Sequence, residues 1–493
     1  MDTILLKSSR DCDTGFLQRG MIMTDRPLWQ RSACETADAI KTGEISCSQA
    51  VSAAVARMRE RNGAINAVVD DLGDEAIAQA EALDARGENT GAKGALYGVP
   101  VTVKENVDQE GKATPNGVTA FKDIIAPADS PVVANFRKAG AIIIGRTNTP
   151  EFSFRVTTDN ELHGRTYNPW NDWASAGGSS GGAAAAVMSG MGPLGHGNDI
   201  AGSLRFPPAA TGATSVKPTL GRVPAYNPSG TAERGLLAQL MSVQGVIGRE
   251  VRDVRLAMRE LINPDPRDPW MVPLPFDGDP VEGPIKVAFT KNTFEFDLHP
   301  AVEKALDSAR EALIDAGYEL VEIEPPLVRE IAREAGSCLF GEINALMGPD
   351  IEKYGSKTIN AIFKDYFEYF GAYEGRELLL GLAKRSHYAR LWSLFLQDYP
   401  LVLTPFLPQP TYASDRDTQG LDGVVEVLGS AVYAYTFNFI GLPAGLIGAN
   451  YNEGLPVGVQ IVGRRFREDM ILDACEAVEQ RIGIMAKTLF ERG

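Results

Sequence analysis

The chain has 493 residues, about three average domain lengths, although large α/β enzymes also reach this size as one body. Charged residues make up 23% and hydrophobic residues 44% of the sequence, which excludes disorder and low complexity as global descriptions. The 48 basic residues are outnumbered by 64 acidic ones, and the net charge of −16 disfavours a phosphate-binding surface. We therefore expect no nucleic acid among the direct ligands.

The predicted elements alternate between helices and strands. Residues 1–26 lack periodicity and are expected to form a loosely attached extension, followed by a single domain over 27–493. In chain order, we expect helices at 32–43, 48–61 and 74–86, a strand at 96–104, a helix at 131–139, a strand at 141–145, and further helix and strand pairs within 301–323 and 455–482. Such alternation predicts a partly parallel sheet covered by helices.

An aromatic cluster stands out in residues 363–373, which hold six aromatic side chains. Four of them follow helical i, i+3, i+4, i+7 spacing and are expected in the core: Phe363, Tyr366, Phe367 and Phe370. Tyr369 and Tyr373 fall on a different stripe, and we expect them to line a pocket. A plain core position for both tyrosines is the alternative.

Cysteine and histidine positions give no metal or disulfide signature. The five cysteines are odd in number and contain no CxxC pair, so a reducing compartment is expected. No two of the four histidines lie within five residues of each other, which removes HExxH and HxH motifs. The N-terminus lacks a secretory pattern, and glycine, proline and asparagine interrupt the most apolar stretch, 432–447. We expect a cytoplasmic protein with no metal and no membrane span.

The most informative segment is GGSSGG at 177–182, where four glycines surround two serines. Glycine permits positive φ and lets backbone N–H groups approach a ligand closely. A helix predicted at Ala183–Met188 would begin at this loop, and N–H groups at a helix N-terminus attract anions, including a developing oxyanion. For an isolated glycine run, a tight turn without function is the alternative.

Several other motif matches compete in this region. The GxGxxG at 190–195 follows a predicted helix and contains a proline, which disfavours a dinucleotide site, and no P-loop occurs. Residues 177–181 fit the GxSxG nucleophile elbow, but turn formers at 171–176 replace the strand that must precede it. His196 lies seven residues before Ser203, yet a Ser–His pair would also need a carboxylate to hold the ring.

Taken together, the ordered motifs resemble the amidase signature family. The matching segments are GVPVTVKEN at 98–106, GRTNTPEF at 145–152, NPW at 168–170, GGSSGG at 177–182, GNDIAGSLRFP at 197–207, KPTLGRVP at 217–224 and GLPVGVQIVG at 454–463. The resemblance extends over roughly residues 30–485, nearly the whole chain. It implies one α/β domain with a mixed, twisted sheet surrounded by helices.

The resemblance also implies a Ser–Ser–Lys catalytic triad. Ser203 matches the nucleophile, Ser179 the bridging serine that follows a cis peptide bond, and Lys104 the general base. The oxyanion hole would consist of the backbone N–H groups of Ile200, Ala201, Gly202 and Ser203. Supporting positions of the signature are matched by Ser180, Asp199 and Arg205.

Two residues depart from the family pattern. Ala201 stands where the family usually has the first of two glycines before the nucleophile, and Asn198 stands where threonine or serine is usual. Because alanine adds a methyl group and disfavours positive φ, we expect loop geometry or substrate access to differ from that of typical members.

A lysine base is chemically reasonable for amide hydrolysis. A serine hydroxyl becomes a good nucleophile when a base takes its proton, and a lysine can do so only when neutral. Lowering its pKa from about 10.4 to near 7 requires roughly 4.6 kcal/mol, which burial and nearby positive charge can supply. Lys104 ends an apolar strand, although a solvated strand-end lysine is the alternative. Lys217, in KPT, is a similarly placed lysine, and only the resemblance favours Lys104 over it as the general base.

We therefore expect hydrolysis of a carboxylic acid amide, aryl or apolar, to an acid plus an amine or ammonia, with no cofactor. One alternative is the glutamine-hydrolysing A-type subunit of a tRNA-dependent amidotransferase, which needs partner chains. A second is a non-catalytic binding protein on the same scaffold, for which Ala201 is the argument. The expected partner is a small-molecule amide, the region 285–425 is expected to shape its pocket, and a homodimer is compatible with the sequence.

Overall fold

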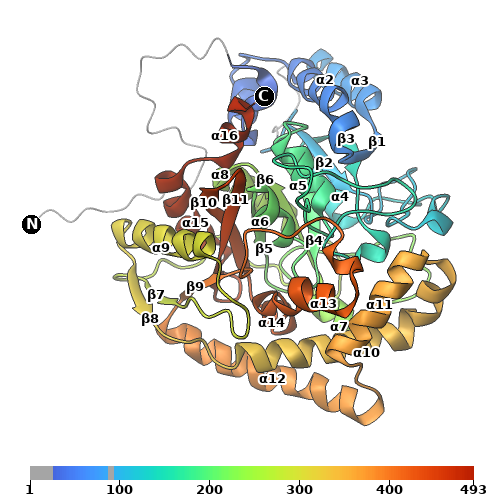
Figure 1. The fold of residues 1–493 in the computed structure, drawn as a ribbon. Helices are drawn as coiled ribbons and strands as arrows, with labels where there is room; N and C mark the ends of the chain where they lie inside the picture. Colours follow the sequence, from blue (N-terminus) through green and yellow to red (C-terminus); the bar gives the residue numbers. More distant parts are fainter. Residues whose placement is uncertain (1–25, 87–93, 493) are drawn as a thin grey trace, which may run out of the picture.

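The computed structural model describes residues 26–86 and 94–492, in which helices surround one mixed β-sheet (Figure 1). Eleven strands of this part of the chain pair in the order β1-β3-β2-β4-β6-β5-β10-β11-β9-β7-β8. Their bounds are β1 Val68–Asp71, β2 Pro100–Lys104, β3 Ile142–Thr147, β4 Leu194–Asp199, β5 Thr214–Lys217, β6 Val243–Gly248, β7 Lys286–Phe289, β8 Glu319–Glu322, β9 Leu401–Pro405, β10 Ala444–Asn452 and β11 Leu455–Gly463. β2 is parallel to β3 and β4, and β7 to β8 and β9, whereas the other pairs are antiparallel. The prediction of a mixed sheet surrounded by helices is confirmed.

The helices that the sequence predicts lie close to their expected positions, and the structure adds others. Their bounds are α1 Ala33–Lys41, α2 Cys47–Ile65, α3 Gly73–Ala85, α4 Pro131–Lys138, α5 Gly181–Met188, α6 Phe206–Thr211, α7 Leu236–Met241, α8 Val251–Leu261, α9 Pro300–Asp315, α10 Val328–Tyr354, α11 Lys357–Phe370, α12 Gly375–Asp398, α13 Gly420–Val424, α14 Val432–Phe439, α15 Glu468–Ile482 and α16 Met485–Glu491. In Figure 1, the long helices α10 and α12 run together along one end of the molecule. Among the described residues, no helix combines the length and apolar character needed to cross a membrane.

Local sequence explains where several elements begin. Ser32 forms a capping box with Glu35 at the start of α1, because each side chain bonds the other residue's backbone N–H, at 3.1 and 2.9 Å. The strand predicted from residue 96 starts only at Pro100, since residues 96–99 form a turn in which Gly98 has a φ of +76°. The extension predicted at 1–26 lies outside the described residues except for its last position, and the single-domain boundary stays a prediction.

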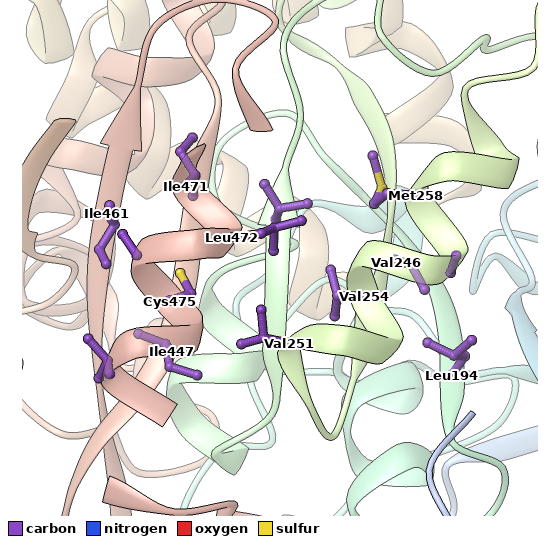
Figure 2. Close-up of a cluster of buried hydrophobic side chains, with 14 of the residues drawn as sticks. Leu194, Val246, Val251, Val254, Met258, Ile447, Ile461, Ile471, Leu472 and Cys475 are labelled. Carbon is purple, nitrogen blue, oxygen red and sulfur yellow. The ribbon is translucent and has the colours of Figure 1, made fainter. Parts of the chain in front are cut away.

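One hydrophobic core lies between the sheet and the helices α8 and α15 (Figure 2). Side chains from both helices meet side chains from the strands β4, β6, β10 and β11 in this core. The labelled residues are Val251, Val254 and Met258 of α8, Ile471, Leu472 and Cys475 of α15, and Leu194, Val246, Ile447 and Ile461 of the strands. Each fully buried aliphatic side chain of this kind contributes about 1.5–3 kcal/mol through removal of apolar surface from water.

A second core holds the aromatic cluster and joins α10, α11, α12 and α14. Phe363 and Tyr366 are buried in it, as their helical spacing predicts. Phe367 and Phe370 are partly exposed but pack against the same cluster. The ring of Phe363 lies 5.2 Å from that of Phe154, which follows the GRTNTPEF segment. The aromatic cluster therefore connects the helical end of the molecule with a loop next to one of the sequence motifs.

The fold brings the candidate catalytic motifs to one place through the neighbouring strands β2 and β4. Because these strands are parallel, their carboxyl ends lie at the same edge of the sheet. β2 ends at Lys104, and β4 ends at Asp199, just before the segment that contains Ser203. The GGSSGG loop leads into α5, which packs against both β2 and β4. The three motifs therefore meet at the ends of two adjacent strands.

Candidate active site

Lys104 and Ser179 are in direct contact at this edge of the sheet. The Lys104 ammonium nitrogen donates a hydrogen bond to Ser179 Oγ at 2.7 Å, and Ser180 Oγ lies 3.3 Å from it. The peptide bond between Gly178 and Ser179 is cis. Ser203 is half-buried, and its hydroxyl has no hydrogen-bond partner within residues 26–86 and 94–492. The first link of the proposed relay is thus formed, whereas the bridge from Ser179 to Ser203 stays a prediction.

Glycines allow the serine loop to lie against other backbone segments. Gly177 has a φ of +77°, and a Cβ there would lie 2.5 Å from Pro207 Cα. A Cβ on Gly178 would lie 2.3 Å from the carbonyl oxygen of Arg155. No real Cβ tolerates such distances, so both positions require glycine. The glycine run therefore places Ser179 close to the backbone on two sides and holds it against Lys104.

Lys104 is fully buried, which excludes the solvated strand-end alternative. Burial lowers the pKa of Lys104 from its ordinary value to about 7, although the negative charges of Asp199 and Glu105 act in the opposite direction. A substantial fraction of the side chain is therefore neutral near pH 7. A neutral amine has the lone pair that a base needs.

Lys217 has the same burial but different neighbours. Burial, followed by the positive charge of Arg205, lowers the pKa of Lys217 to about 7 as well. Its ammonium group donates to the carbonyl oxygen of Pro218 at 2.9 Å, and no serine hydroxyl is among its hydrogen-bond partners in the described chain. Contact with a serine, and not the pKa, therefore distinguishes Lys104 from Lys217.

An Asp199–Arg205 pair supports the segment that contains Ser203. Both side chains are buried, and Asp199 Oδ2 accepts hydrogen bonds from Arg205 Nε at 3.0 Å and from Leu204 N at 3.1 Å. Burial alone would raise the pKa of Asp199, but the Arg205 guanidinium holds it below its usual range. Arg205 also donates to Gln460 and to the backbone carbonyl of Ala434. Arg205 thus connects the segment that contains Ser203 to β11 and α14.

The backbone of this segment shows which N–H groups can bind an oxyanion. The N–H of Gly202 donates to Asp199 Oδ1 at 2.6 Å and is therefore engaged. The other predicted donors are Ile200, Ala201 and Ser203, whose N–H groups have no hydrogen-bond partner in the described chain. Three of the four predicted donors are thus available in this conformation.

Glycine is needed at position 202 but not at 201. Gly202 has a φ of +119°, and a Cβ there would lie 2.6 Å from the Phe206 ring. Ala201 is not among the described residues with positive φ. The methyl group of Ala201 therefore causes no backbone strain, which removes the reason for expecting a distorted loop.

The histidine alternative lacks the contacts it needs. His196 is buried, and its Nε2 lies 2.9 Å from Gln244 Oε1, with no carboxylate or serine partner in the described chain. Burial lowers the pKa of His196 to about 3. His163 instead pairs with Glu105 at 2.9 Å. No group of three or more His, Cys, Asp or Glu side chains in the described residues is arranged to hold a metal ion.

Tyr369 and Tyr373 line a cavity of about 770 Å³ between α10, α11 and α14. Other aromatic and charged side chains on its wall are Phe296, Phe370, Tyr435, Arg329, Arg333, Glu295, Glu330 and Glu334. Neither Lys104 nor the two serines line this cavity. Helix α14 lies beside both the cavity and the segment that contains Ser203. Its Tyr435 lines the cavity, and its Ala434 Cβ lies 3.3 Å from the position that a Cβ on Gly202 would take.

Sequence reasoning identifies Asn198 only as a departure from the family pattern and gives Asn106 no role. Both asparagines lie beside Lys104: the lysine ammonium donates to Asn198 Oδ1 at 2.9 Å, and the two asparagine side chains bond each other. The sequence feature that points to this contact is the amide of Asn198 at a position where the family usually has a hydroxyl. Its meaning depends on a contact between residues 92 positions apart, which the sequence does not show.

A mixed sheet surrounded by helices holds a buried lysine in contact with a serine, which is the arrangement that the sequence motifs imply. Residues 49–472 match the family model described as Amidase. The chain belongs to the amidase family, and it is an amidase, a hydrolase of carboxylic acid amides. The predicted family and enzyme class are confirmed.

Individual relatives agree with this assignment. An indoleacetamide hydrolase from Bradyrhizobium diazoefficiens is 45% identical over 466 residues, which cover 94% of this chain and 89% of that protein. The A-type subunit of the glutamyl-tRNA(Gln) amidotransferase from Heliobacterium modesticaldum is 28% identical, with 93% and 98% covered. The crystal structure of a bacterial aryl acylamidase has a TM-score of 0.79 and 26% identity, covering 92% of this chain and 97% of that one.

The geometry of the segment before Ser203 predicts different effects at its two small residues. We expect Gly202→Ala to lose at least 10²-fold in kcat/KM, because the new Cβ would meet Phe206 and the backbone φ is unfavourable for alanine. Ala201→Gly is the matched control and should stay within about threefold of the parent enzyme. Steady-state kinetics on folded variants measure both effects, and equal losses at the two positions would contradict this account of the loop.

Proposed function

We propose that this amidase cleaves an apolar aryl-substituted acetamide, of the indoleacetamide type, to the carboxylate and ammonia through a Ser203 acyl-enzyme. The observation that carries the mechanism is the hydrogen bond between the buried Lys104 ammonium group and Ser179 Oγ. The 45% identity to an indoleacetamide hydrolase over nearly the whole chain supports the substrate class. The aromatic walls of the cavity at Tyr369 and Tyr373 are suited to an aryl group.

In the proposed mechanism, neutral Lys104 takes the proton of Ser179 while Ser179 takes that of Ser203. Ser203 Oγ then attacks the amide carbonyl carbon, and the N–H groups of Ile200, Ala201 and Ser203 stabilise the tetrahedral oxyanion. Ser179 returns a proton to the departing nitrogen, which leaves as ammonia. Water then loses a proton to the same relay and attacks the acyl carbon. The bond between Ser203 Oγ and the acyl group breaks, the relay returns the proton to Ser203, and the acid leaves and ionises to the carboxylate.

Glutamine hydrolysis within an amidotransferase is the second candidate function, supported by the 28% identity to an A-type subunit over 98% of that protein. The lower identity and the aromatic cavity favour the aryl amide. Two measurements on the purified chain separate them: release of ammonia from indoleacetamide and release of ammonia from glutamine. Turnover of glutamine alone would reverse the proposal.

The first prediction of the proposed mechanism concerns Lys104. Because the base must be neutral, kcat/KM should rise with pH through about 7 and stay high into the alkaline range. Lys104→Ala should lose several orders of magnitude, since removal of a catalytic base costs about 10² or more. Lys104→Arg should be equally inactive, because arginine retains its proton.

Histidine substitutions serve as the comparison. His196 and His163, changed one at a time, should leave substantial activity in every folded variant. A Lys104→Arg enzyme with normal turnover, or a folded histidine variant without activity, would show that the Ser–Ser–Lys assignment is wrong.

The second prediction identifies the acylated residue. A fluorophosphonate should modify Ser203, because its half-buried hydroxyl follows the segment with free N–H groups. Peptide mass spectrometry should locate the label, and Ser203→Ala should abolish it. Labelling of Ser179 in place of Ser203 would instead support the α/β-hydrolase-like alternative.

The third prediction concerns the cavity. Tyr369→Ala and Tyr373→Ala should change the ratio of kcat/KM for aryl and short alkyl amides by about tenfold while the protein stays folded, because both side chains line the cavity. Phe363→Ala is the matched core variant, and it should lower the free energy of unfolding by about 3–5 kcal/mol. Tyrosine variants that unfold, or that fold and keep the parent selectivity, would remove these residues from the pocket.

A further inference from the structure

The ammonium nitrogen of Lys104 has three oxygen neighbours, which differ in what they can do with a proton. Ser179 Oγ lies at 2.7 Å, Asn198 Oδ1 at 2.9 Å and Ser180 Oγ at 3.3 Å. A protonated lysine has three N–H groups and can donate one to each oxygen. A neutral lysine has only two N–H groups and one lone pair, so one of the three oxygens must face the lone pair.

The hydrogens available on the three neighbours show which oxygen faces the lone pair of neutral Lys104. Asn198 Oδ1 is an amide carbonyl oxygen and has no hydrogen, so it must accept from the lysine. The Ser180 hydroxyl donates its hydrogen to the backbone carbonyl of Asn198 at 3.3 Å, so Ser180 Oγ also accepts. The hydroxyl hydrogen of Ser179 has no other acceptor in the described chain. Ser179 is therefore the neighbour that faces the lone pair and donates its proton to it.

Asn198 keeps its carbonyl oxygen on the lysine because Asn106 holds the amide from the other side. Asn198 Nδ2 donates to Asn106 Oδ1 at 2.9 Å, and Asn106 Nδ2 donates to Asn198 Oδ1 at 3.2 Å. Asn106 Nδ2 also donates to Ser153 Oγ at 3.0 Å. A flipped Asn198 amide would place its NH₂ group against the lysine N–H groups and lose both bonds of the pair. The reciprocal bonds thus fix the direction of the amide.

We propose that Asn198, oriented by Asn106, is a positioning residue that accepts one N–H of neutral Lys104 and so directs the lysine lone pair at Ser179. This inference rests on the proposed function, because it assigns a role within the Lys104–Ser179–Ser203 relay. The Asn198 amide neither gains nor loses a proton in this relay. It acts only through the orientation and the proton affinity of the base.

The charged surroundings of Lys104 set the direction of each expected shift. Asp199, at the end of β4, and Glu105, next to the lysine on the chain, both raise its pKa, while burial lowers it. His196, also on β4, faces the same region and is held neutral by burial. Asn198 is a neutral acceptor that favours the three-donor ammonium over the two-donor amine. Removing it should therefore lower the pKa of Lys104, and a negative charge in its place should raise it.

The test follows the rate of Ser203 inactivation by a fluorophosphonate between about pH 5 and 10, which needs no identified amide. Asn198→Asp should move the alkaline-rising limb upward by about one pH unit or more. Asn198→Leu should move the limb downward and lower the plateau rate at least tenfold, because the lone pair is no longer directed. Asn198→Thr, which restores an acceptor oxygen, should recover most of the plateau rate.

A double-mutant cycle tests the part assigned to Asn106. Asn106→Ala and Asn198→Ala should lower the plateau rate by factors that do not multiply in the double variant, because each removes the same oriented amide.

Asn450→Asp is the matched control for Asn198→Asp. This residue of β10 donates to the carbonyl oxygen of Ala301 at 3.3 Å, and its substitution should leave the alkaline-rising limb of the pH profile in place.

If Asn198 had only a structural role, the Asp and Leu variants would not shift the alkaline-rising limb of the pH profile in opposite directions. Lower plateaus with an unmoved limb in both variants would overturn the inference, as would independent effects in the double-mutant cycle. If the Leu variant does not fold, the Asp variant decides alone, and an unmoved limb again overturns the inference. Absence of Ser203 labelling in the parent enzyme would instead overturn the proposed function.

Discussion

The site depends on a lysine that is buried among neutral oxygens. Lowering the pKa of Lys104 from 10.5 to about 7 corresponds to about 5 kcal/mol of preference against the charged form. The pKa of Lys104 stays low only if nearby carboxylates do not pair with the lysine. Asp199 is bonded to Arg205 and to backbone N–H groups, and Glu105 to His163 and the N–H of Gly117. Both carboxylates therefore have other partners, and the lysine is left with serine and asparagine.

The surrounding fold maintains this separation. Lys104 and Glu105 follow each other on the chain, but β2 ends at Lys104 and the two side chains contact different neighbours. Asp199 ends the parallel neighbour β4 and accepts hydrogen bonds from the N–H groups of Gly202 and Leu204, one on either side of Ser203. Asp199 thus supports the segment that contains Ser203 without pairing with Lys104. The arrangement explains why the Asp199–Arg205 pair is completely buried although a buried pair adds little stability by itself.

Much of this could be predicted from the sequence, because it depends on local patterns and ordered motifs. Helix α1, with its capping box, and the alternation of helices and strands follow from short-range rules. The contact of Lys104 with Ser179 is implied by the resemblance of two separate motifs. The Asn106–Asn198 pair is not predictable, because its register depends on how β2 lies beside β4. The hydrogen bond from the Gly202 N–H to Asp199 could not be predicted for a similar reason, because it depends on the orientation of that carboxylate.

Helix α14 has a consequence for how this enzyme would distinguish its substrates. One side of the helix lines the cavity through Tyr435, while the carbonyl of Ala434 and the side chain of Asn438 accept hydrogen bonds from Arg205. Arg205 in turn fixes Asp199 and the segment before Ser203. A ligand that displaces α14 would therefore also displace the segment that contains Ser203. We therefore expect discrimination among amides to appear in kcat as well as in KM, so that a poorly fitting amide can bind and still react slowly.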